Sequence, residues 1–70
     1  MGKIQYQIEY MIESDVLETE IEFTEKKAIK TAKKMLDNSH REGYCLISKL
    51  EEDDWGYYNT IEQDYITINK

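Results

Sequence analysis

Apolar and polar side chains alternate along the first part of this chain, and this spacing restricts the fold more than any other feature. One parity of residues 4–12 holds Ile4, Tyr6, Ile8, Tyr10 and Ile12. The other parity is mostly polar, and a period of two predicts a strand with one buried face. A second alternating run spans residues 17–23 and follows turn-forming residues at 13–16. We therefore expect an antiparallel hairpin that pairs residues 3–13 with residues 17–23.

The alternation also predicts which surface each side chain of the hairpin occupies. The apolar set is expected to face the core, with Ile8 and Ile21 on the same covered face: Ile4, Ile8, Ile12, Leu17, Ile21 and Phe23. The carboxylates of the other parity are then expected on the outer surface of the sheet: Glu9, Glu13, Glu18, Glu20 and Glu22. Glutamate is uncommon in strands, and like charges on neighbouring strands are destabilising, so this acidic surface indicates a use in binding.

From residue 25 the apolar spacing changes to about 3.6 residues, which predicts a helix over residues 25–42. Thr24 is the expected N-cap, Glu25 lies in the first turn, and Gly43 follows the last turn. One arc of the helix is apolar and is expected to pack on the sheet: Ala28, Ile29, Ala32, Met35, Leu36 and Ser39. The opposite arc is basic and is expected to face solvent: Lys26, Lys27, Lys30, Lys33, Lys34 and Arg41.

Strand-forming residues return after the helix, at residues 44–50 and 57–68, on either side of an acidic turn. In the last run Ile61 and Tyr65 share one parity, whereas Ile66 and Ile68 share the other. Either a bulge or a break at residues 62–64 reconciles the two phases. The prediction for residues 1–70 is a single small α+β domain of ββαββ order, with one amphipathic helix packed on a four- or five-stranded, mostly antiparallel sheet.

Composition excludes several classes of protein. The chain has 70 residues, of which 34% are charged, and its formal net charge is −6. A single cysteine can form neither an internal disulfide nor a zinc site of several thiolates, which favours a reducing, cytoplasmic setting. The longest apolar run, residues 44–47, is far too short for a membrane span or for the apolar region of a signal peptide.

The sequence lacks the motifs that support catalysis or cofactor binding. Its glycines, at positions 2, 43 and 56, are isolated, whereas a phosphate-binding loop needs them clustered. A Cys45–His40 pair could activate a thiolate, but an ordinary strand position and an ordinary helix end explain these residues better. The acidic run at residues 51–54 lacks the alternating spacing of a calcium loop. We expect a protein that is not an enzyme and that holds no metal or cofactor.

Basic and acidic residues are divided unequally along the chain. Residues 25–42 carry six basic and three acidic side chains, a net of +3, and the remaining residues carry three basic and twelve acidic ones, a net of −9. The expected domain is therefore basic on its helix side and acidic on its sheet side. Because opposed charges steer association, the acidic surface predicts a basic protein partner, and nucleic-acid-binding proteins commonly have strongly basic grooves.

Aromatic residues in the C-terminal part add anchors of the kind that dominate protein interfaces: Trp55, Tyr57, Tyr58 and Tyr65. In size, charge and aromatic content the chain is similar to the small acidic inhibitors that phages and mobile elements encode. This resemblance implies an acidic, aromatic sheet surface that occupies the groove of a nucleic-acid-binding partner in place of the phosphate backbone.

Two other functions are compatible with the same residues. Direct binding of nucleic acid would use the basic helix face: Lys26, Lys30, Lys33, Lys34 and Arg41. The net negative charge opposes the approach of a polyanion, so this function is less favoured. Self-association is the other alternative, either by docking of the basic helix face on the acidic surface of a second copy or by pairing of edge strands.

Overall fold

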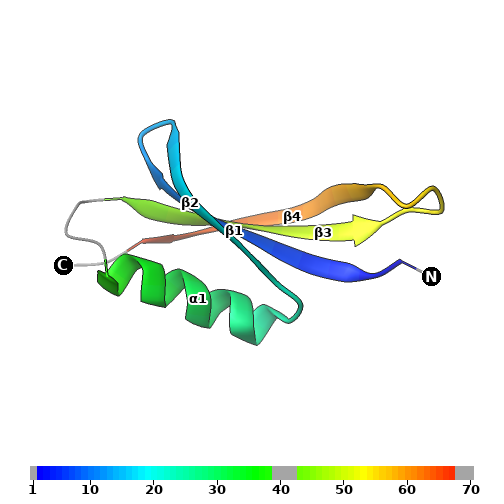
Figure 1. Ribbon diagram of the computed structural model, residues 1–70, viewed down its shortest axis with the longest axis horizontal. Helices are drawn as coiled ribbons and strands as arrows, with labels where there is room; N and C mark the ends of the chain where they lie inside the picture. The colour runs from blue at the N-terminus through cyan, green and yellow to red at the C-terminus, as the bar shows by residue number, and fades with distance from the viewer. Residues whose placement is uncertain (1, 39–42, 68–70) are drawn as a thin grey trace.

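The computed structural model describes residues 2–38 and 43–67. The elements are, in order, β1 (Ile4–Ile12), β2 (Asp15–Glu22), α1 (Glu25–Asn38), β3 (Tyr44–Glu52) and β4 (Tyr58–Thr67). The four strands form one antiparallel sheet of order β2-β1-β3-β4, and α1 packs on one face of it (Figure 1). The predicted α+β architecture, with one helix on a four-stranded antiparallel sheet, is confirmed. We call the other sheet face, on the side away from α1, the open face.

Thr24 caps the helix as predicted. Its Oγ1 accepts a hydrogen bond from the backbone N–H of Lys27 (3.2 Å), and its carbonyl accepts one from Ala28 (3.0 Å). The predicted helix extends to residue 42, but residues 39–42 lie outside the described part, so the role predicted for Gly43 at the helix end is undecided. Gly43 has another constraint, because a Cβ there would lie 2.7 Å from Cε1 of Tyr10.

The predicted orientation of the second strand is wrong. On β1, Ile8 is fully buried beneath the helix, as expected. Its direct partner on β2 is Glu20, and residues directly opposite each other in a sheet point to the same face. Glu20 therefore lies on the helix side of the sheet, together with Glu18 and Glu22 of the same parity. Ile21 lies on the open face instead of the covered one.

A β-bulge at Leu17 causes this inversion. The first pairs after the turn include Met11–Val16, but the next pair joins Tyr10 to Glu18, so Leu17 is an extra residue in β2. Without it, the odd-numbered positions of β2 would face the helix, as the alternation predicted. Because side chains alternate with a period of two, one extra residue moves every following side chain to the opposite face.

The core is consequently smaller than predicted. Leu17, Ile21 and Phe23, all expected in it, are exposed, and Phe23 in the β2–α1 connection is 71% exposed. Among the described residues, the buried apolar side chains come from β1, β3 and α1: Ile8, Tyr10, Ala28, Ala32, Met35, Leu36, Cys45 and Ile47. The predicted apolar arc of the helix is confirmed at its described positions, and the two small alanines let α1 approach the sheet closely.

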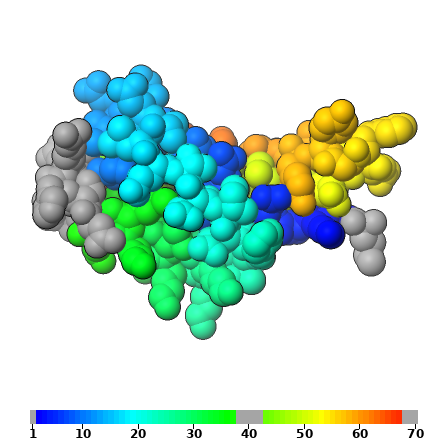
Figure 2. Space-filling model, viewed as in Figure 1, coloured from blue at the N-terminus to red at the C-terminus, as the bar shows by residue number. Residues whose placement is uncertain are grey.

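The hairpin of β3 and β4 reaches well beyond the helix. Figure 1 shows its turn at one end of the molecule, far from α1, and Figure 2 shows it as a narrow projection. The overall extents are 41 × 24 × 15 Å, so the molecule is long and flat. β4 is one strand with a bulge at Ile61, since Lys49 pairs with Glu62 and Leu50 with Thr60. Of the two alternatives that the sequence left open, the bulge is correct.

Candidate binding site

The side chain of Asp53 holds the turn between β3 and β4 in shape. Its Oδ1 accepts hydrogen bonds from the backbone N–H groups of Trp55 (2.9 Å) and Tyr57 (3.0 Å), and its Oδ2 accepts one from Asn59 Nδ2 (3.1 Å). The backbone N–H of Asp53 donates to the Tyr57 carbonyl (2.8 Å), and that of Gly56 donates to the Asp53 carbonyl (3.1 Å). Gly56 has a φ of 86°, in the left-handed region that favours glycine. The sequence of the turn thus specifies its conformation.

These hydrogen bonds lower the pKa of Asp53 from its ordinary value. The largest cause is the bond from the Tyr57 backbone N–H, and the bonds from Asn59 and Trp55 act in the same direction. Loss of hydration is the second-largest effect, and it opposes these bonds without reversing the direction of the pKa shift. The carboxylate is therefore charged at neutral pH, and its charge is what makes it a strong acceptor for the turn.

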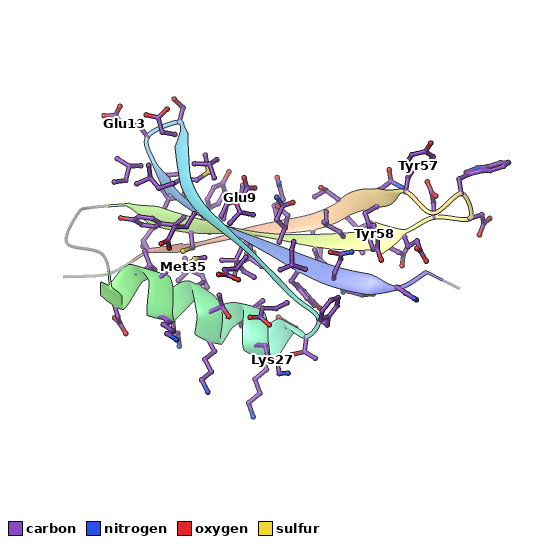
Figure 3. The ribbon with its side chains drawn as sticks, viewed as in Figure 1. Glu9, Glu13, Lys27, Met35, Tyr57 and Tyr58 are labelled. Atoms are coloured by element: carbon purple, nitrogen blue, oxygen red, sulfur yellow. The ribbon has the colours of Figure 1, made fainter. Side chains whose placement is uncertain are left out.

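Aromatic side chains project from this turn into solvent. Trp55 is 84% exposed and Tyr57 is 72% exposed, although both backbone N–H groups are fixed by Asp53. Tyr58 follows at the start of β4, and Figure 3 shows Tyr57 and Tyr58 at the end of the hairpin that is remote from the helix. Carboxylates occupy the adjoining exposed positions, Glu51 and Asp54. We call residues 51–58 the hairpin tip.

The acidic residues of β2 lie on the helix side of the sheet, where Glu18 and Glu20 are exposed and Glu22 is half-buried. Glu18, Glu20 and Glu22 line a cleft of about 310 Å³ together with three residues of α1: Thr31, Lys34 and Met35. The Thr31 hydroxyl donates a hydrogen bond of 2.7 Å to Glu22 Oε2. Glu22 therefore joins β2 to the helix, whereas Glu18 and Glu20 stay exposed beside it.

The remaining two residues of the predicted acidic surface lie elsewhere. Glu9 is half-buried on the open face, where Leu46 and Thr19 are its cross-strand neighbours (Figure 3). Glu13 is in the β1–β2 turn at a φ of 56°, and its carbonyl accepts a hydrogen bond of 2.9 Å from the Tyr44 hydroxyl. The five predicted carboxylates thus occupy three separate places and do not form one acidic face.

The predicted aromatic anchors are divided as well. Trp55, Tyr57 and Tyr58 belong to the hairpin tip, but Tyr65 is further along β4 on the open face, opposite Leu46. Its ring lies 5.7 Å from that of Tyr44, at an angle of 59°. Tyr65 is therefore a component of the open face and not of the tip.

The basic residues of the alternative site follow the helix. Lys26, Lys30, Lys33 and Lys34 are all exposed on α1, and Arg41 lies outside the described residues. Lys34 also borders the cleft that holds the glutamates of β2. The basic stripe therefore adjoins the carboxylates of β2 on one side.

Cys45, which the sequence offered as a candidate nucleophile, is poorly placed to react. It is fully buried, and its thiol donates to the Ala32 carbonyl of the helix (3.5 Å). Burial, assisted by the negative charge of Glu18, raises the pKa of Cys45 to about 11. Within the described residues, no three His, Cys, Asp or Glu side chains are grouped so that they could hold a metal ion, and no helix has the length and apolarity to cross a bilayer.

Sequence reasoning missed two features of the molecule. The acceptor role of Asp53 has a recognisable signal, since aspartate followed closely by glycine is typical of turns. The low charge of the open face has a weaker sequence signal. It is the pair of glutamines, at positions 5 and 7, between the apolar residues of the first strand.

Comparison of this chain with protein-family models, with curated proteins and with solved structures finds no match.

Proposed function

We propose that this protein is a small acidic interaction module that binds a basic protein partner through its hairpin tip. The observation that carries the proposal is Trp55, which is 84% exposed on a turn that Asp53 holds in one conformation. The acidic, aromatic surface expected from the sequence is retained in this proposal, but it is moved from the sheet face to the tip.

A binding loop that is already ordered loses less conformational freedom when it meets its partner. Side chains that become fixed only on binding lose conformational freedom, and this loss reduces affinity. Here the backbone at Trp55 and Tyr57 is already tied to Asp53 before any partner arrives. A tryptophan buries about 150–250 Å² on contact, which makes it the most effective single anchor for a protein surface.

Charge identifies the class of partner. The tip combines the aromatic side chains with the carboxylates of Glu51, Glu52, Asp53 and Asp54, and the whole chain has a net charge of −6. Such a surface accelerates association with a basic surface and slows association with an acidic one. A nucleic-acid-binding protein is the basic partner we favour, and inhibition by occupying its groove is the activity. The buried, free Cys45 agrees with a reducing, cytoplasmic setting.

The experiment is affinity capture with matched aromatic variants. Immobilised parent protein, Trp55→Ala, Tyr57→Ala and Phe23→Ala are incubated with the same lysate, and retained proteins are identified by mass spectrometry. Phe23 is the control because it is about as exposed as Tyr57 but lies in the β2–α1 connection. We expect a basic protein that the parent and Phe23→Ala retain and that both tip variants lose.

The purified partner then allows a quantitative test. By calorimetry, Trp55→Ala should weaken binding by about 2 kcal/mol or more, a factor of about 30. Glu51→Gln combined with Asp54→Asn should mainly slow association, and added salt should weaken the parent complex by screening. If the tip variants bind as tightly as the parent, the tip is not the binding site and the proposal is wrong.

A further inference from the structure

The open face of the sheet is almost free of charge. Its positions follow from the cross-strand pairs, because residues opposite each other share a face. Within the described strands they are Gln5, Gln7, Glu9, Met11, Val16, Thr19, Ile21, Tyr44, Leu46, Ser48, Leu50, Glu52, Tyr58, Thr60, Gln63, Tyr65 and Thr67. Glu9 and Glu52 are the charged members of this set, and Glu52 lies at the end of its strand.

This low charge is unusual for the molecule. In the whole chain 34% of residues are charged, and the helix side of the same strands holds a dense set: Asp15, Glu18, Glu20, Glu22, Lys49, Glu51, Glu62 and Asp64. The open face instead exposes apolar groups, among them Val16, Ile21 and Tyr65. Depletion of charge and enrichment in aromatic and apolar side chains distinguish the centre of a protein interface from ordinary surface.

The polar groups of the open face favour a second copy as the occupant. In a two-fold dimer the same surface meets itself, so a charged group tends to approach its own kind. Amides and hydroxyls both donate and accept hydrogen bonds and can therefore pair with themselves. Gln63 Nε2 already donates to Ser48 Oγ (3.2 Å) within this face, which shows the type of bond that it can make. A strongly charged foreign partner would find almost no complementary charge here.

The outline of the face is near the lower limit for a stable dimer. Strands lie about 4.8 Å apart and rise about 3.3 Å per residue, so four strands of eight to ten residues cover roughly 550 Å² in outline. Two copies would bury roughly 1,100 Å² if the faces were smooth, and side chains that project from them would add to this area. Stable interfaces begin at ~1,200 Å². We propose that two copies of this chain pack through their open faces, sheet against sheet, with the helices outside. The open face shares Glu52 and Tyr58 with the hairpin tip, but Trp55 and Tyr57 lie outside it, so the two kinds of binding can be tested separately.

The test is the oligomeric state of the full chain and of lysine variants at the open face. Sedimentation equilibrium at rising protein concentration is run on the parent, Ile21→Lys, Tyr65→Lys and Phe23→Lys. Lysine is chosen because it lowers the net negative charge, so overall repulsion between copies decreases and cannot itself explain dissociation. Phe23→Lys is the control, since Phe23 is exposed but lies outside the strands. Circular dichroism establishes that each variant is folded.

We expect a dimer for the parent and for Phe23→Lys, and a dissociation constant raised about 30-fold or more by each open-face variant. High salt should leave the parent dimer intact, because its interface holds little charge. A monomeric parent would overturn the proposal, and so would a dimer that both open-face variants preserve, which would indicate edge pairing or charged docking. Trp55→Ala should remain dimeric, which separates this result from a failure of the tip to bind.

Discussion

The two faces of the sheet differ in the kinds of side chain they carry. On the helix side, the central strands supply Ile8, Cys45 and Ile47 to the core, while β2 supplies three glutamates that line a cleft beside α1. On the open face the same strands carry amides, hydroxyls and apolar groups. The comparison teaches that, within the sheet, the charged side chains are concentrated on the face that the helix packs against. The carboxylates of the hairpin tip lie apart from both the helix and its lysines.

Deleting side-chain volume on each face should give the largest contrast. Leu36 is 3% exposed against the sheet, and Leu36→Ala should lower the free energy of unfolding by about 2–5 kcal/mol through the cavity it leaves. Ile21→Ala on the open face removes a similar side chain, yet in dilute solution it should cost less than about 1 kcal/mol. Urea unfolding of both variants measures the difference. Equal losses would show that the open face is covered within a single chain.

Reversing the charge of β2 should give the next largest effect. We expect the triple change Glu18→Lys, Glu20→Lys and Glu22→Lys to destabilise the domain by about 1–3 kcal/mol, because it removes the Thr31–Glu22 hydrogen bond and places lysines beside Lys34. Glu9→Lys on the open face is the control and should change the unfolding free energy by less than about 0.5 kcal/mol. Thermal and urea unfolding provide the measurement. A triple variant as stable as the parent would mean that these glutamates are merely solvated.

Alkaline pH should test the buried thiol on the helix side. The pKa of Cys45 is raised to about 11 in the folded chain, above its ordinary value of 9.0. Because the folded-state pKa is above the unfolded one, folding favours the protonated thiol. This contribution to the free energy of unfolding is complete below pH 9 and is lost as pH rises toward 11. The loss cannot exceed about 1.4 kcal/mol per pH unit. The slope of unfolding free energy against pH, compared between the parent and Cys45→Ala, isolates this effect from the tyrosines, and identical slopes would contradict it.

Acid should loosen the hairpin tip, and of the four tests this one should change the stability of the whole domain least. The pKa of Asp53 is lowered from its ordinary value of 3.8, so its contribution to the turn is complete above that pH and is lost as pH falls below it. The fluorescence of Trp55, the one tryptophan of the chain, should report loss of turn order in this range. Asp53→Asn should show the altered fluorescence already at neutral pH, with an unchanged midpoint of global unfolding. A parent-like spectrum for Asp53→Asn would show that the carboxylate does not hold the turn.

The sequence by itself determined the elements of this fold. Period-two runs predicted β1 and the presence of β2, and the change to a period of 3.6 predicted α1 with its Thr24 cap and its buried Ala28, Ala32 and Leu36. These features depend on local spacing and local hydrogen bonds, which are written into neighbouring residues. The acidic turn before Trp55 was recognisable for the same reason.

Only the tertiary structure decided which way β2 faces. The pattern of residues 15–22 is compatible with either face, and a single extra residue, Leu17, selects the one that places the glutamates on the helix side of the sheet. That choice depends on the register against β1 and on the position of Thr31 and Lys34, which come from a distant part of the chain. The uncharged open face is the consequence, because the apolar residues of β2 are turned toward it. Side-chain alternation fixes the pattern along a strand, but a bulge and its neighbours fix the phase.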